Sequence, residues 1–117
     1  MEPRFKQLKV WQKAKDLAVH MYRITDKGKI SKEFSLRDQM RRAAVSVASN
    51  IAEGDERETD KESIRFFYIA RASSAELMTQ SIIAHEAGYF DVETVRFIES
   101  EAASISKMLY RLIKARS

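Results

Sequence analysis

Cationic side chains near both ends of the chain are the groups most able to do chemistry. From Arg4 to Lys15 there are five lysines and arginines and no carboxylate before Asp16, and further cations gather between Lys107 and Arg116. Such clusters attract the phosphates of nucleic acids by counterion release, with little reading of bases. The candidate nucleic-acid-binding residues are Lys6, Lys9, Lys13, Lys15, Arg111 and Lys114.

Ordinary structural roles also account for these cations. Positive charges near the C-terminus of a helix are favoured by the helix dipole, and lysines on an outer helix face keep it solvated. The formal net charge of +4 is modest for a protein that binds nucleic acid. Phosphate binding and a merely solvated surface therefore both remain open.

A second group of polar residues recurs at helical spacing. Intervals of four, four and three place one set on a single helix face: Arg42, Ser46, Asn50 and Glu53. Arg71 and Glu76 offer complementary charges on a later helix. Because carboxylates alternate with arginines here, the pattern favours a structural polar network that fixes helix register. A ligand or nucleic-acid site is the alternative.

Residue patterns typical of catalysis are missing from the sequence. There is no cysteine, and the two histidines, His20 and His85, are not part of any Glu-x-x-His pair of the di-iron type. No phosphate-cradling glycine loop or nucleophile elbow occurs. We therefore expect no enzyme activity, no catalytic residue, no metal site and no cofactor.

Composition and periodicity indicate an all-α protein. Only three glycines and one proline are present, too few for the turns of a β-rich domain. Apolar spacing predicts four helices at about 5–26, 36–53, 60–87 and 92–115, within a single domain spanning 1–117. Short links between the later helices favour an up-down-up-down antiparallel four-helix bundle.

Local signals mark the ends of these predicted helices. Ser35 is the predicted N-cap of the second helix, and Gly54 is its predicted left-handed C-terminal residue. The later boundaries are marked by a capping box, an acidic N-cap and a glycine: Thr59 with Glu62, Asp91, and Gly88.

The second helix is rich in small residues, and the third is apolar over much of its girth. Both features predict self-association, although a filled four-helix core could absorb the same surface. The absence of cysteine, of a leader and of any apolar run of about 20 residues favours a cytoplasmic protein.

Three blocks of the sequence carry a family resemblance. They are residues 8–14 with Val10-Trp11-Gln12, residues 39–54 ending in Asn50-Ile51-Ala52-Glu53-Gly54, and residues 66–77. In these blocks the chain resembles the 23S rRNA intervening-sequence proteins, a four-helix bundle family related to the accessory variability determinants of diversity-generating retroelements.

The resemblance implies a bacterial, non-enzymatic bundle that assembles into a ring-like homopentamer. It also implies a basic surface that binds RNA or DNA. The alternative that it implies is an interaction scaffold that docks a protein partner such as a reverse transcriptase.

Overall fold

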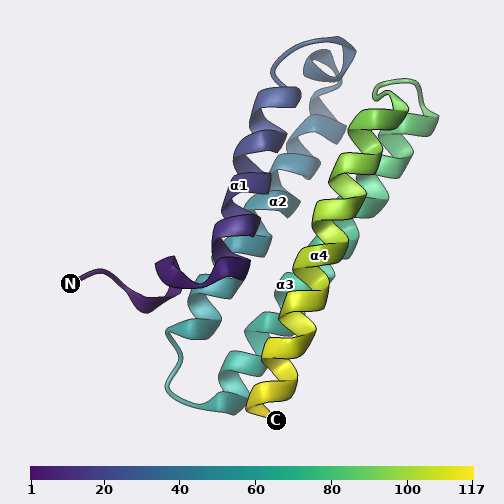
Figure 1. Ribbon diagram of the computed structural model, residues 1–117. Coiled ribbons are helices and arrows are strands. Elements are labelled where there is room, and N and C mark those ends of the chain that lie inside the picture. Colours follow the sequence, from purple (N-terminus) through teal and green to yellow (C-terminus); the bar gives the residue numbers. More distant parts are fainter.

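The protein consists of four α-helices and two short 3-10 turns, with no β-strand (Figure 1). A computed structural model describes all residues, 1–117. The elements are η1 (Arg4–Gln7), α1 (Lys9–Ile24), η2 (Lys29–Lys32), α2 (Phe34–Asp55), α3 (Asp60–Glu86) and α4 (Val92–Arg116). The predicted all-α fold with four helices is confirmed. None of the helices combines the length and the hydropathy that crossing a membrane requires.

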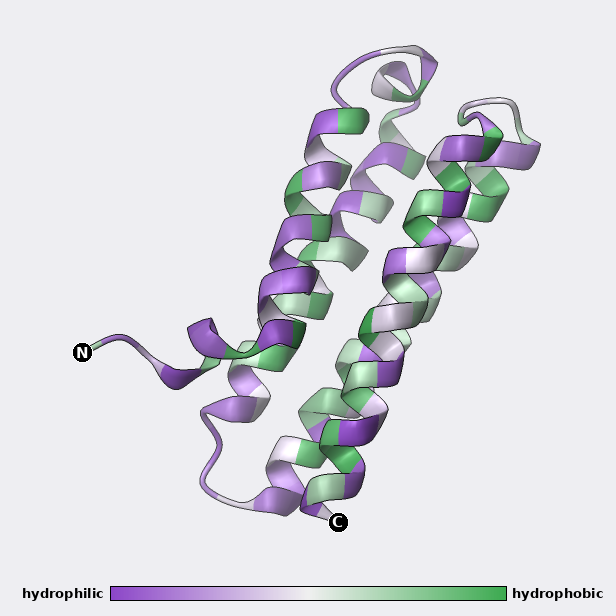
Figure 2. Ribbon diagram, in the orientation of Figure 1, coloured by the Kyte–Doolittle hydropathy of each residue, from purple (hydrophilic) through white to green (hydrophobic).

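One hydrophobic core runs between the helices. Helix α1 contacts α2 and α4, and α3 also contacts both α2 and α4. Figure 2 shows hydrophilic and hydrophobic residues alternating along each helix, as one buried face per helix requires. Large side chains such as Met21, Phe67 and Ile98 are fully buried in this core. Each contributes about 1.5–3 kcal/mol relative to an exposed position.

Helix α1 begins later and ends earlier than the predicted range of about 5–26. Leu8 is extended (φ −71°, ψ 125°), so the helix begins at Lys9 and the preceding η1 turn is separate. The turn places the Phe5 ring edge-on to Trp11, with 5.2 Å between ring centroids. Residues six apart do not share a helix face, so this contact requires the break at Leu8.

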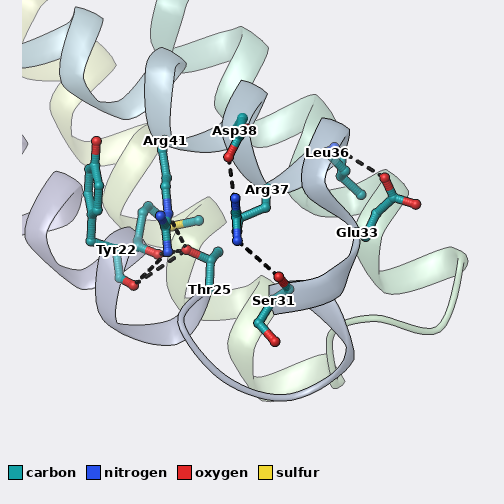
Figure 3. Close-up of polar contacts among 9 residues, drawn as sticks. Tyr22, Thr25, Ser31, Glu33, Leu36, Arg37, Asp38 and Arg41 are labelled. Carbon is teal, nitrogen blue, oxygen red and sulfur yellow. Dashed lines mark hydrogen bonds and ion pairs between the residues drawn. The ribbon is translucent and has the colours of Figure 1, made fainter.

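The start of α2 differs from the prediction as well. The helix begins at Phe34, and its N-cap is Glu33, whose Oε1 accepts the Leu36 N–H at 3.5 Å (Figure 3). The predicted cap, Ser35, instead accepts a hydrogen bond from the Gln39 amide on the helix surface. Arg37 explains the shift, because its Nη1 donates to the Ser31 carbonyl at 3.0 Å and holds η2 against the first turn of α2.

Gly54 does not end α2 in a left-handed conformation, because positive φ angles occur only at Gly28 and Gly88. The helix passes through Gly54 and continues to Asp55. A Cβ atom at Gly54 would lie only 2.6 Å from Cε1 of Phe67. The residue is therefore suited to the close approach of α2 and α3 rather than to a turn.

The other predicted boundaries are confirmed. Thr59 Oγ1 accepts the Glu62 N–H at 3.2 Å and caps α3. Asp91 Oδ1 accepts the Thr94 N–H at 2.8 Å and caps α4. Gly88, at φ 91°, follows the last turn of α3.

Candidate nucleic-acid interface

Three of the six candidate nucleic-acid contacts are engaged in ion pairs within the chain. The pairs are Lys6–Glu2 at 2.7 Å, Lys13–Glu101 at 3.0 Å and Lys15–Asp16 at 2.7 Å. A phosphate that approached these lysines would meet a neighbouring carboxylate. Their charge therefore adds little to the attraction of an anion.

The other three candidates, Lys9, Arg111 and Lys114, are exposed and form no ion pair within 4 Å. Lys9 at the start of α1 and Arg111 near the end of α4 line one open groove of about 350 Å³, together with Leu8 and Met108. The structure thus brings the N-terminal and C-terminal cation clusters together at the α1–α4 edge.

Helix α4 has no carboxylate after Glu101, while its cations continue to the end. Lys107, Arg111 and Lys114 are spaced by four and three residues, so they lie on one exposed face of the helix. Lys107 was not among the candidate contacts derived from the sequence. The signal that could have identified it was this spacing within an acid-free stretch.

Arg116 is not part of this face, because it binds the buried carboxylate of Asp55. Arg116 Nη2 lies 3.1 Å from Asp55 Oδ1, and Arg4 binds the same carboxylate through Nη2 at 2.7 Å and Nε at 3.3 Å. The guanidinium of Arg116 also lies over the Phe67 ring, 5.1 Å from its centroid. We call Arg4, Asp55 and Arg116 the Asp55 cluster.

The electrostatics of the Asp55 cluster favour the charged carboxylate. Burial of Asp55, whose side chain is 1% exposed, acts to raise its pKa. The hydrogen bonds and charges of Arg4 and Arg116 outweigh burial, so the net pKa of Asp55 lies below its ordinary value. The carboxylate fastens the N-terminal turn and α4 to the end of α2. Sequence reasoning missed this cluster, because its members are 51 and 61 residues apart.

The predicted polar network forms only in part. Ser46 Oγ lies 2.9 Å from Ser73 Oγ, and Asn50 Nδ2 donates to Ser46 Oγ at 3.0 Å. These three residues join the polar edges of α2 and α3. These hydrogen bonds satisfy the two hydroxyl groups and the amide nitrogen of Asn50.

The charged members of that predicted network lie apart. Arg71 turns to α4, where its Nε donates to Ser106 Oγ at 3.2 Å, and Glu53 pairs with Arg57 at 3.8 Å. Arg42 and Glu76 are exposed and form no ion pair. The expected arginine–glutamate pairs between helices do not form.

Each of the two histidines has a structural contact. His85 Nδ1 lies 2.9 Å from the Phe90 carbonyl oxygen, and the His20 ring lies against Phe97 with 4.7 Å between centroids. Burial lowers the pKa of His20, and the nearby Arg23 adds to this effect. No three histidine, aspartate or glutamate residues come together as a metal site would require.

The chain was compared with family models, curated proteins and solved structures. A family model described as 23S rRNA-intervening sequence protein matches residues 6–111. A crystal structure from Bacteroides thetaiotaomicron, described as a protein of unknown function from the S23 ribosomal protein family, is similar with a TM-score of 0.82. It is 24% identical and covers 90% of this chain and 98% of that chain, which shows a shared fold. No curated protein matches the chain.

Proposed function

We propose that this chain, which belongs to the 23S rRNA-intervening sequence protein family, is a non-enzymatic, oligomeric bundle that binds structured RNA or DNA. The observation that carries the proposal is the free, exposed cationic edge formed by Lys9, Arg111 and Lys114. No carboxylate of α4 lies beyond Glu101 to neutralise it.

The contacts are with phosphates rather than bases. Lys9, Arg111 and Lys114 stand as primary contacts, and Lys107 extends their face along α4. Lysine and arginine on a convex helix surface reach phosphate oxygens without entering a groove, which gives affinity without sequence preference. Lys6, Lys13 and Lys15 contribute less, because each would first have to leave its carboxylate.

Assembly multiplies this cationic edge. The proposal takes the chain as an up-down-up-down bundle in a ring-like homopentamer, located in the cytoplasm. An apolar groove of about 550 Å³ between α1 and α2 supports self-association, since Val19 and Val45 in its lining remain about 40% exposed. A second groove on α3 exposes Tyr68 and Ile69. Surfaces of this kind mark interaction sites.

Fluorescence anisotropy with an RNA hairpin and a DNA duplex tests the proposal. The probes are titrated with the purified protein between about 50 and 200 mM salt. Three phosphate contacts per chain give a log–log slope of affinity against salt of about −2 to −3. The double variant Lys9→Glu/Arg111→Glu is expected to weaken both probes alike and to flatten this slope.

The double variant Lys27→Glu/Lys29→Glu is the control matched in charge. Both lysines are exposed and form no ion pair, and they lie beyond the opposite end of α1 from Lys9. Equal loss of binding in this control and in Lys9→Glu/Arg111→Glu would mean that only net charge matters. Unchanged binding in Lys9→Glu/Arg111→Glu would overturn the assignment of the cationic edge.

The second candidate function is an interaction scaffold that docks a protein such as a reverse transcriptase. The observation in its favour is the same open apolar groove between α1 and α2. No binding of either probe at low salt, together with retention of a protein partner in a pull-down, would favour this candidate.

A further inference from the structure

We propose that the face shared by α3 and α4 holds a stacking site for an unpaired base, centred on Tyr110, which directs the protein to single-stranded segments of nucleic acid. This inference rests on the proposed nucleic-acid binding and adds the class of strand that is recognised. Tyr110, Arg71 and Lys114 form the site, which we call the Tyr110 patch.

Tyr110 lies exposed between two cations. Its side chain is 47% exposed, although tyrosine is large and apolar. The guanidinium carbon of Arg71 lies 5.4 Å from the ring centroid, and Lys114 Nζ lies 5.9 Å from it. Arg71 is held in place by its hydrogen bond to Ser106, whereas Lys114 has no ion-pair partner. The hydrogen bond to Ser106 thus fixes Arg71 beside the ring, and the exposure of Tyr110 leaves part of the ring accessible to solvent.

The stretches of α3 and α4 that carry the patch contain no acidic side chain. Helix α3 has no carboxylate between Glu62 and Glu76, and α4 has none after Glu101. The hydrogen bonds Arg71–Ser106 and Ser74–Ala102 place these two acid-free stretches side by side. The only buried carboxylate at this end, Asp55, is neutralised by its two arginines. An anion that approaches Tyr110 thus meets cations from both helices.

An exposed aromatic ring among unpaired cations matches the chemistry of single-strand binding. Proteins that bind single strands stack bases on aromatic side chains and hold the backbone with lysine and arginine. The bases of a duplex are stacked on one another, so their faces cannot reach the ring. Lys107, Arg111 and Lys114 share the α4 face with Tyr110 and can contact phosphates that flank the stacked base. The patch is continuous with the cationic edge at Lys9.

A second tyrosine shows what distinguishes this site. Tyr22 is also 47% exposed and has Arg41 at 4.7 Å from its ring centroid. Arg41 donates hydrogen bonds to Thr25 Oγ1 at 2.9 Å and to the Tyr22 carbonyl oxygen at 3.4 Å (Figure 3). Asp26, which follows α1, and Asp38 on α2 are both close in sequence to this pair. Tyr22 therefore provides a matched tyrosine that should not bind nucleic acid.

The test compares single-stranded RNA, single-stranded DNA of the same sequence and a blunt DNA duplex as anisotropy probes. Tyr110→Leu is expected to weaken single-strand binding on the order of tenfold, as the loss of one stacked base predicts, and to leave duplex binding unchanged. Tyr110→Phe keeps the ring and should bind like the parent chain, as should Tyr22→Leu. The RNA and DNA arms show which sugar the site prefers.

A direct readout of stacking completes the test. A single strand that carries 2-aminopurine should lose fluorescence on binding the parent chain and regain it with Tyr110→Leu. Equal losses for single strands and duplex in Tyr110→Leu, or no quenching by the parent chain, would overturn the stacking site. If Lys9→Glu/Arg111→Glu weakens every probe while Tyr110→Leu changes none, the proposed function stands and this inference fails. If the parent chain binds no probe, both fail.

Discussion

Replacing Gly54 by alanine should destabilise the protein, although alanine is the better helix former. In an exposed helix interior the change would stabilise by about 1 kcal/mol. Here the new methyl carbon would lie 2.6 Å from Cε1 and 2.9 Å from Cδ1 of Phe67, and 3.1 Å from Cβ of Phe66. These separations are below van der Waals contact, so either the ring or the helices must move.

Both movements cost free energy. The Phe67 side chain is fully buried, with Arg116 over its ring, so the ring has no open space to enter. Separation of α2 from α3 would stretch the hydrogen bond from Ser63 Oγ to the Gly54 carbonyl, which is 2.7 Å long. Overpacking costs about 1–3 kcal/mol, and the hydrogen bond is worth about 1 kcal/mol. After the gain in helix propensity, the expected net loss is about 1–3 kcal/mol.

Urea unfolding followed by far-UV circular dichroism measures this loss. All variants should be compared at one protein concentration, because association adds to apparent stability. The double variant Gly54→Ala/Phe67→Leu identifies the cause, since leucine lacks the ring atoms that the new methyl group would meet. The cost of Gly54→Ala should be smaller in the Phe67→Leu background. A Gly54→Ala protein more stable than the parent, or an equal cost in both backgrounds, would refute the reasoning.

Two further predictions concern stability. Because the pKa of Asp55 is lowered in the folded protein, ionised Asp55 stabilises the fold. This stabilisation is complete above the pKa of Asp55 in the unfolded chain, about 4, and is lost as pH falls through its pKa in the folded chain. The urea midpoint of the parent chain should therefore fall more steeply than that of Asp55→Asn between neutral and acidic pH, and parallel curves would contradict the assignment. Gly88→Ala places a side chain at φ 91° where its Cβ meets nothing within 4 Å, so only backbone strain should cost stability, by about 1–2 kcal/mol. Its urea midpoint should fall by the same amount with or without Phe67→Leu, unlike that of Gly54→Ala.

Boundaries set by local chemistry could be predicted from the sequence. Thr59 and Asp91 accept hydrogen bonds from backbone N–H groups three residues later in the chain. Gly88 adopts a positive φ angle, which glycine does without steric strain. Each of these interactions is complete within one helical turn. The number and approximate extent of the helices could be predicted for the same reason.

Features set by contacts between distant segments could not be predicted in this way. Gly54 resembles a helix C-cap in sequence, but its neighbour in space is Phe67 on the next helix. Lys13 appeared to be a free cation, yet its partner Glu101 is 88 residues away. Arg71 has several acceptors within reach of its long side chain, and packing against α4 selects Ser106. Of the six candidate contacts, only Lys9, Arg111 and Lys114 are free of ion pairs in the folded chain, and nucleic-acid binding by any of the six stays a prediction.

The Asp55 cluster has a consequence for the behaviour of the two ends of the chain. Arg4 and Arg116 donate to the same oxygen, Asp55 Oδ1. The two ends of the chain are therefore linked to each other noncovalently through one carboxylate. Fraying of either end leaves the shared carboxylate with less compensation for its burial, which strengthens its hold on the remaining arginine. Detachment of one terminus thus makes detachment of the other less favourable, and this end of the bundle opens fully only when both Arg4 and Arg116 have left Asp55.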